Sequence, residues 1–167
     1  MTRGRLALTT LGCSRNDVDS DELRARLTAD GWEVTDDESG ADAILVNTCA
    51  FVASAKKDSI DTVLSAADHA PVIVTGCMAE RYGRDLAAEL PEAAAVVGFD
   101  AYTSISSVVD QVLRGDAVPS HVPRDRRLLL PLSPVERSVD GVPGTAGLAR
   151  TVTDAFVAVK LASGCDR

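Results

Sequence analysis

The sequence lacks a hydrophobic run long enough to cross a membrane. No apolar stretch approaches the roughly 18 to 20 residues that a spanning helix needs, although 46% of the 167 residues are hydrophobic. The first residues, MTRGRLALTTLGC, contain arginines and a short apolar run but no small-residue cleavage site of the kind that ends a secretory signal. We therefore expect a cytoplasmic protein with no membrane partner.

Motifs for nucleotide binding and for serine hydrolase chemistry are also missing. No G-x-G-x-x-G follows a predicted strand, and neither G-x-x-x-x-G-K-[ST] nor G-x-S-x-G occurs, so no residue is assignable as catalytic. Lysine and arginine total 17 against 25 aspartates and glutamates, which gives a net charge of −8. An acidic surface repels phosphate backbones, and direct nucleic-acid binding by this segment is therefore not expected.

Histidine is scarce, with two residues in the chain. His69 follows a predicted helix and His121 lies among prolines. Ordinary solvent-exposed histidines account for both, and neither makes a convincing metal ligand. Lys56 and Lys57 begin a predicted helix, where a solvated face is the simplest interpretation.

Over its first 115 residues the sequence alternates strand-like and helix-like segments. Strands are expected at 5–12, 32–34, 41–48, 71–76 and 93–98, and helices at 19–31, 54–68, 79–90 and 103–115. In the first helix, Asp19 or Ser20 is expected as the N-cap and Gly31 as the end. Strands alternating with helices of this length indicate βαβ units. The predicted fold class is α/β, an open parallel sheet with helices on both faces.

The character of the sequence changes after residue 115, where the first predicted domain (1–115) ends. Residues 116–150 contain five of the seven prolines and are predicted to be an interdomain linker. Residues 155–161 then resemble a new strand, six residues before the end. Because one strand does not make a domain, residues 151–167 are expected to start a second domain that is truncated here, in a fragment of a longer protein.

All four cysteines come directly after predicted strands: Cys13, Cys49, Cys77 and Cys165. In a parallel sheet the carboxyl ends of the strands lie along one edge, which is where open α/β proteins bind ligands. We therefore expect the first three cysteines to converge. One such cysteine is more often a packed thiol than a ligand, but three at equivalent positions leave a metal site and incidental burial equally open.

The residues beside these cysteines suggest the kind of site. Gly12 and Gly76 allow the backbone to approach a bulky group closely, and Asn47 and Thr48 offer donors to sulfur. Structural zinc usually takes four ligands, often in closely spaced pairs, and no such pair occurs. Thiolates suit iron–sulfur clusters, and three cysteines would leave one iron of a 4Fe–4S cluster open to an exogenous ligand.

At these residues the sequence resembles the methylthiotransferase family of radical S-adenosylmethionine enzymes. LGCSRNDVDSDEL, VNTCAFVASAKKDSID and VIVTGC are similar to the family's three cysteine segments in order, and VKLASGCDR resembles the approach to its C-x-x-x-C-x-x-C motif. Leu11 before Gly12, and CAFVASAKKDSI, resemble the branch that modifies an aspartate of small-subunit ribosomal protein S-twelve. Ser14 and Arg15 stand where that branch often has Pro-Lys.

The resemblance implies a flavodoxin-like domain in which Cys13, Cys49 and Cys77 hold an auxiliary 4Fe–4S cluster that delivers sulfur. It implies that Cys165 is the first ligand of a second 4Fe–4S cluster, which binds S-adenosylmethionine at the first strand of a radical-SAM barrel. The other two ligands of that cluster would lie outside this chain. The fragment alone is therefore expected to be inactive.

The implied reaction is radical methylthiolation of the Cβ of an aspartate. The resemblance implies a small-subunit ribosomal protein as substrate, free or in the ribosomal subunit, and an electron donor for cluster reduction. Two alternatives stay open at this point. One is a methylthiotransferase that modifies adenosine in tRNA, and the other is a non-catalytic flavodoxin-like binding module with three incidental thiols.

Overall fold

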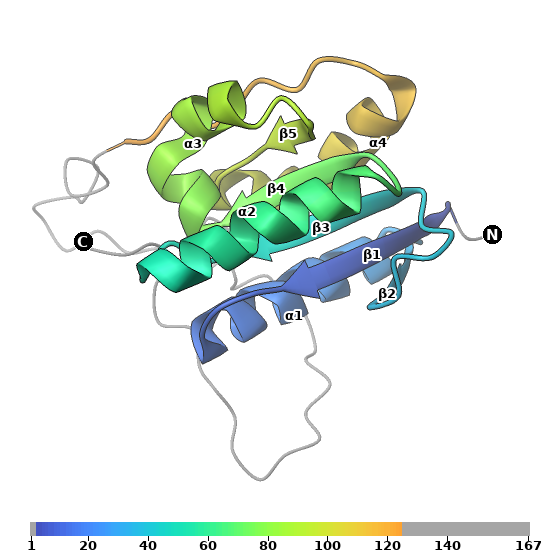
Figure 1. Cartoon of the computed structure of the whole chain (residues 1–167). Helices are drawn as coiled ribbons and strands as arrows, with labels where there is room; N and C mark the ends of the chain where they lie inside the picture. The colour runs from blue at the N-terminus through green and yellow to red at the C-terminus, as the bar shows by residue number, and fades with distance from the viewer. Residues whose placement is uncertain (1–2, 125–167) are drawn as a thin grey trace, which may run out of the picture.

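Five parallel strands form one sheet between two layers of helices. The computed structural model describes residues 3–124. The elements in chain order are β1 (Arg5–Thr10), α1 (Ser14–Ala29), β2 (Glu33–Thr35), β3 (Ala43–Thr48), α2 (Ala53–Ala67), β4 (Val72–Gly76), α3 (Cys77–Glu89), β5 (Ala93–Val96), the 3-10 helix η1 (Phe99–Ser104) and α4 (Ile105–Arg114). All strand pairs are parallel (Figure 1). The predicted α/β fold with an open parallel sheet is confirmed.

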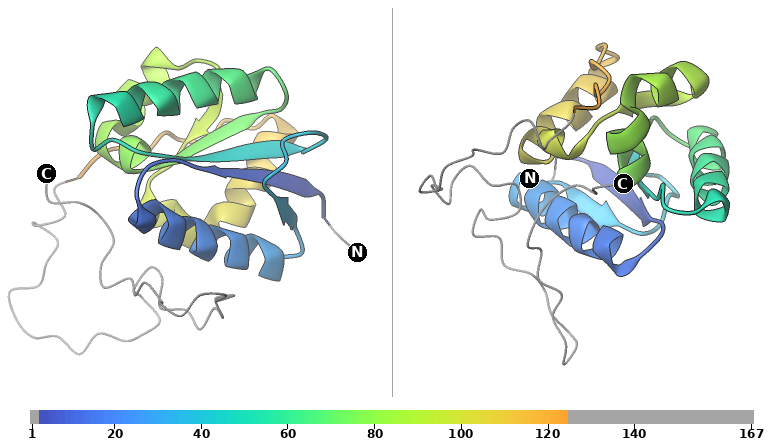
Figure 2. Two further views of the ribbon diagram at one scale, coloured as in Figure 1. Left: turned by 60° about the horizontal axis from the view of Figure 1, so that its bottom comes forward. Right: turned by 90° about the vertical axis from the view of Figure 1, so that its left-hand side faces the viewer.

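The two faces of the sheet carry different helices. Successive residues of a strand point to opposite faces, so in β3 Leu45 packs with α1 and α4, whereas Ile44 and Val46 pack with α2 and α3. Figure 2 shows α2 on one side of the sheet and α1 and α4 on the other. All six residues of β3 are buried, because a central parallel strand is covered on both faces.

The strand order β2-β1-β3-β4-β5 places a topological switch point between β1 and β3. From β1 the chain crosses through α1 to β2 on one side, and from β3 onward it crosses through α2 and α3 to the other side. Open α/β sheets bind ligands outside the carboxyl ends of their strands at such a point. The loops after β1 and β3 contain Cys13 and Cys49.

Helix α1 begins earlier than the sequence predicted. It starts at Ser14, directly after Cys13, and the Cys13 carbonyl accepts a hydrogen bond from the backbone N–H of Asn16 at 2.8 Å. Asp19 and Ser20, the expected N-caps, lie inside the helix and are 2% and 6% exposed. Residues of this type usually disfavour a helix interior because their side chains compete for backbone groups. Here tertiary contacts to the sheet override that local preference.

The start of the predicted linker packs against the domain instead of leaving it. The His121 amide donates to the carbonyl of Val96 at 2.9 Å, at the outer edge of β5. The His121 side chain is 10% exposed, and its Nε2 lies 3.4 Å from Glu80 Oε2. The expectation of a solvent-exposed His121 is therefore wrong, whereas His69 is exposed as predicted.

Two glycines make room for His121. Gly83 interrupts α3 with φ +42°, and a Cβ there would lie 2.1 Å from the His121 carbonyl oxygen. A Cβ at Gly98 would lie 2.4 Å from His121 Nδ1. Local sequence patterns gave no sign of this contact, because the two glycines meet His121 only in the folded chain.

Replacing His121 with alanine should loosen the segment that follows α4. The substitution removes the imidazole packed on Gly98 and its contact with Glu80, a loss of about 1.4 kcal/mol for a half-buried polar contact. We expect hydrogen exchange at the amide of residue 121 to accelerate roughly tenfold, measured by mass spectrometry. His69→Ala, at the exposed histidine, is the matched control. Unchanged exchange in His121→Ala would show that the side chain does not hold this segment.

The predicted boundary at residue 115 and the linker at 116–150 stay predictions. The expected strand at 155–161, Cys165 and the start of a second domain at 151–167 lie outside the described residues. Within residues 3–124, no helix is both long and apolar enough to span a membrane.

Candidate metal centre

The loops that contain the first three cysteines meet at the carboxyl end of β1, β3 and β4. Thr48 and Gly76 are register partners in β3 and β4, and Cys49 and Cys77 directly follow them in the chain. Strand β1 pairs with β3 up to its last residue, so the loop with Cys13 starts beside the same edge. The loops after β1 and β3 and the first residue of α3 therefore lie at one edge of the sheet, and a shared ligand set of the three thiols stays a prediction.

Gly12 brings the β1–α1 loop against Cys49. Its φ is +103°, and a Cβ at this position would lie 2.6 Å from the Cβ and 2.8 Å from the Sγ of Cys49. Gly76 plays the same part between β4 and β3, because a Cβ there would lie 2.2 Å from Asn47 Oδ1 and 2.6 Å from the carbonyl oxygen of Thr48. Both glycines therefore permit close approach between neighbouring loops of the chain itself.

The three thiols differ in exposure and in acidity. None is in a disulfide; Cys13 is exposed, Cys49 is 5% exposed and Cys77 is intermediate. Burial raises the pKa of the Cys77 thiol to about 11, and Asp19 and Cys49 add to the effect. Cys77 is therefore a neutral thiol at pH 7 in the metal-free chain, and a metal that binds it as thiolate must displace a proton.

The rates of alkylation should distinguish these thiols in the metal-free chain. With iodoacetamide at pH 8, Cys13 should react first, and Cys77 on the order of tenfold more slowly than a thiol of ordinary acidity, because little of it is thiolate. The rate at Cys77 should keep rising as the pH approaches its pKa of about 11. Peptide mass spectrometry over time measures each site. A Cys77 that reacts as fast as Cys13 at pH 8 would contradict this.

Asn47 and Thr48 are not the sulfur donors that the sequence suggested. Both are fully buried. Asn47 Nδ2 donates to the Asn16 carbonyl and to Ser20 Oγ, both at 2.9 Å, and Thr48 Oγ1 donates to the Thr75 carbonyl at 2.5 Å. Their donors hold the end of β3 against α1 and β4, and so they fix the loop that leads into Cys49.

Asn16 is the residue at this site that the sequence analysis missed. It is fully buried, its Nδ2 donates to the carbonyls of Leu11 and Thr48, and the Sγ of Cys77 lies 3.5 Å from its Oδ1 in a hydrogen bond. One side chain thus contacts the loops of all three strands. The spacing of Asn16, Asp19 and Ser20, which puts them on one helix face, was a signal that could have revealed it.

Two further contacts tie the helices at this end together. Ser59 of α2 is fully buried, and its Oγ accepts from the Cys49 amide at 3.1 Å. Lys56 Nζ donates to the Tyr82 hydroxyl at 2.8 Å and lies 5.3 Å from the centre of its ring, so Lys56 is not simply solvated. Lys57 is exposed as expected and pairs with Asp61.

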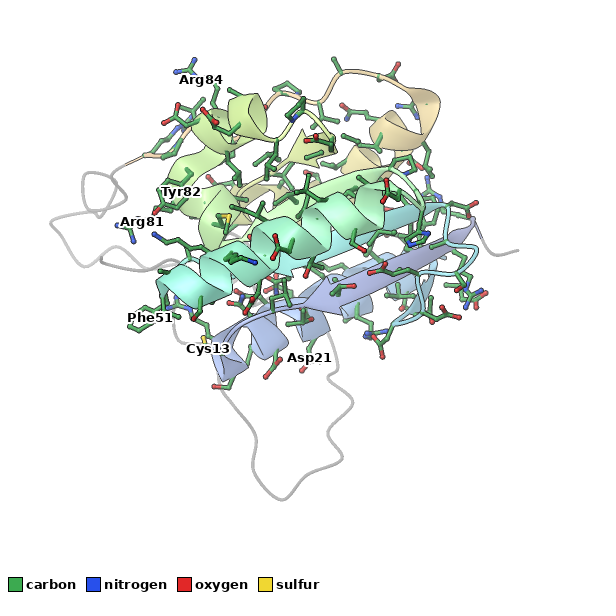
Figure 3. The ribbon with its side chains drawn as sticks, in the orientation of Figure 1. Cys13, Asp21, Phe51, Arg81, Tyr82 and Arg84 are labelled. Carbon is green, nitrogen blue, oxygen red and sulfur yellow. The ribbon has the colours of Figure 1, made fainter. Side chains whose placement is uncertain are left out.

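The exposed rim of this end carries an aromatic residue. Phe51, two residues after Cys49, is 68% exposed. Figure 3 shows Cys13, Phe51, Arg81 and Tyr82 at the same end of the domain, beyond the carboxyl ends of the strands. The thiol edge is therefore open to solvent or to a further part of the protein.

The three thiols are donors of one chemical kind. Within residues 3–124, no group of three or more His, Cys, Asp or Glu side chains is placed so that it could hold a metal ion. Three free cysteines on adjacent loops supply the thiolate ligands that iron–sulfur clusters take.

Comparison with known proteins gives consistent similarities. The family described as "Uncharacterized protein family UPF0004" matches residues 5–98. The chain is 53% identical to "Ribosomal protein uS12 methylthiotransferase RimO" of Saccharopolyspora erythraea over 98% of this chain and 37% of that protein. It is 51% identical to the protein of the same name from Frankia alni, over 98% and 35%. The chain therefore spans little more than a third of the length of these curated relatives.

Proposed function

Because this chain belongs to the family described as "Uncharacterized protein family UPF0004", we propose that it is the N-terminal part of a radical-SAM methylthiotransferase. The proposed reaction is methylthiolation of the Cβ of an aspartate in a small-subunit ribosomal protein. The relatives named as uS12 methylthiotransferases, about half identical over nearly the whole chain, support this substrate.

The observation that carries the proposal is the register of β3 and β4. It pairs Thr48 with Gly76, so that Cys49 and Cys77, the next residue of each chain segment, lie side by side, while Gly12 holds the Cys13 loop against Cys49. This placement of three thiols at one sheet edge, beside a switch point, supports a shared ligand set over three scattered thiols. A non-catalytic binding module has no need of that placement.

In this proposal Cys13, Cys49 and Cys77 hold an auxiliary 4Fe–4S cluster. When bound, that cluster supplies the sulfur that is transferred. The chain's own residues keep the thiols in place: Ser59 fixes the Cys49 backbone, and Asn16 joins the three loops. Cys77 gives up its proton when it becomes a ligand. The exposed side of the edge, at Cys13, leaves room for the substrate.

Cys165 is proposed as the first ligand of a second 4Fe–4S cluster, which binds S-adenosylmethionine in a following barrel domain. The proposed partners are the ribosomal protein, free or in its subunit, and an electron donor that reduces the clusters. We propose a cytoplasmic location, where ribosomal subunits are found. With one of three cysteines of that motif, the chain alone is expected not to cleave S-adenosylmethionine.

The decisive experiment compares substrates for the full-length enzyme. The anaerobically reconstituted protein is incubated with S-adenosylmethionine and a reductant, together with purified small ribosomal subunits or with tRNA. Mass spectrometry should find a methylthio group on an aspartate of the ribosomal protein and none on tRNA nucleosides. Modification of tRNA alone would overturn the proposed substrate and favour the tRNA-modifying alternative.

A further inference from the structure

Asn16 contacts the β1–α1 loop, the end of β3 and Cys77 at the start of α3 through one side chain. Its Nδ2 donates to the Leu11 carbonyl at 2.6 Å and to the Thr48 carbonyl at 3.1 Å, and its Oδ1 accepts from the Cys77 thiol, with 3.5 Å between oxygen and sulfur. The residue is 0% exposed. Solvent therefore does not compete for these contacts.

The orientation of this amide is fixed by groups other than cysteine. An amide nitrogen has two protons, and both are used by the carbonyls of Leu11 and Thr48. Turning the amide over would place its oxygen against those two carbonyl oxygens and leave them buried without donors, which costs free energy. Asn47 Nδ2 also donates to the Asn16 backbone carbonyl and fixes the main chain. The side-chain oxygen therefore faces Cys77 in the metal-free chain, and the two carbonyls that hold the amide do not depend on the thiol proton.

We infer that Asn16 is a positioning residue that lowers the reduction potential of the group bound at Cys77, by presenting the negative end of its amide dipole to the ligand sulfur. Hydrogen bonds donated to cluster sulfurs are one of the factors that set the potential of an iron–sulfur cluster. A carbonyl oxygen in the same place has the opposite effect on the potential. Its partial negative charge opposes the negative charge that reduction adds, and so it lowers the potential. Asp19, 2% exposed, acts on Cys77 in the same direction.

The inference rests on the proposed function, since it needs a redox-active cluster at these cysteines. Its consequence for the chemistry is a cluster that accepts an electron less readily. A C–S bond formed between a bound sulfur and a carbon-centred radical leaves one electron on the cluster, so the potential set by Asn16 is one factor in the free energy of that transfer. The same amide also holds the three loops in register, so position and potential depend on one residue.

The test is a redox titration of the chain after anaerobic reconstitution with iron and sulfide. Visible absorption and electron paramagnetic resonance monitor the titration. Asn16→Ala should shift the midpoint potential upward relative to wild type. Ser20→Ala is the matched control, because Ser20 contacts Thr10 and Asn47 but no cysteine. It should lose stability without a shift in potential.

Each outcome decides between the proposals. A wild-type chain that binds no iron overturns the proposed function and this inference with it. Iron bound in both proteins, with an unchanged potential in Asn16→Ala, overturns the inference alone. If the alanine variant holds no iron, Asn16→Leu is titrated instead, because leucine is close to asparagine in size and has no amide dipole, and it should also shift the potential upward. An unchanged or lowered potential in that variant overturns the inference.

Discussion

Replacing Gly76 with alanine is expected to lower the free energy of unfolding by about 3 kcal/mol, one of the largest effects of any single methyl group in the domain. Gly76 has φ +88° and ψ −163°, a region that is essentially confined to glycine and costs an L-residue about 1–3 kcal/mol. The added Cβ would also lie 2.2 Å from Asn47 Oδ1, 2.6 Å from the Thr48 carbonyl oxygen and 2.7 Å from the Thr48 nitrogen. Overpacking of this kind costs roughly 1–3 kcal/mol more.

Urea unfolding monitored by circular dichroism measures this loss, and Gly115→Ala is the control for a positive φ without a clash. Gly115 has φ +76° and ψ 16°, in the left-handed region, and a Cβ there meets nothing within 4 Å. That variant should lose about 1 kcal/mol. A loss in Gly76→Ala no larger than this would mean that neither the backbone conformation of Gly76 nor the close approach of β3 and β4 carries a further cost.

Replacing Cys49 with serine is expected to abolish most iron binding while leaving the fold intact. Serine is close to cysteine in size, and the backbone bond from the Cys49 amide to Ser59 does not involve the thiol. A hydroxyl is a poor ligand for iron–sulfur clusters, and two thiolates cannot replace three. After anaerobic reconstitution and desalting, iron per chain should fall to about a tenth or less of the wild-type value, measured by a colorimetric iron assay.

Cys165→Ser is the matched control for this substitution, because it removes one thiol by the same chemical change. Cys165 is proposed for a different cluster, and the variant should keep wild-type iron content. Circular dichroism of Cys49→Ser should match wild type, which separates loss of a ligand from loss of the fold. An iron content per chain in Cys49→Ser as high as in wild type would refute the assignment of the auxiliary cluster and favour the binding-module alternative.

The sequence predicted the sheet well because its signals are local. Runs such as Ala43–Thr48 are unbroken and apolar, and helices between them leave few choices other than parallel strands. It also predicted that three cysteines would follow three strands of one sheet. Boundaries were poorer: the first helix was expected at Asp19 and begins at Ser14, because burial against the sheet outweighs the capping preference of Asp19 and Ser20.

By itself, the sequence determined the fold class and the end of the sheet where the thiols lie, because strand direction and residue order are enough to place them. Only the tertiary structure decided how the thiols are held. Asn16 meets the Thr48 carbonyl and Cys77, which are 32 and 61 residues away in the chain, and His121 docks beside Glu80 and Gly98. Such contacts depend on strand order and register, which bring together residues that no local pattern relates.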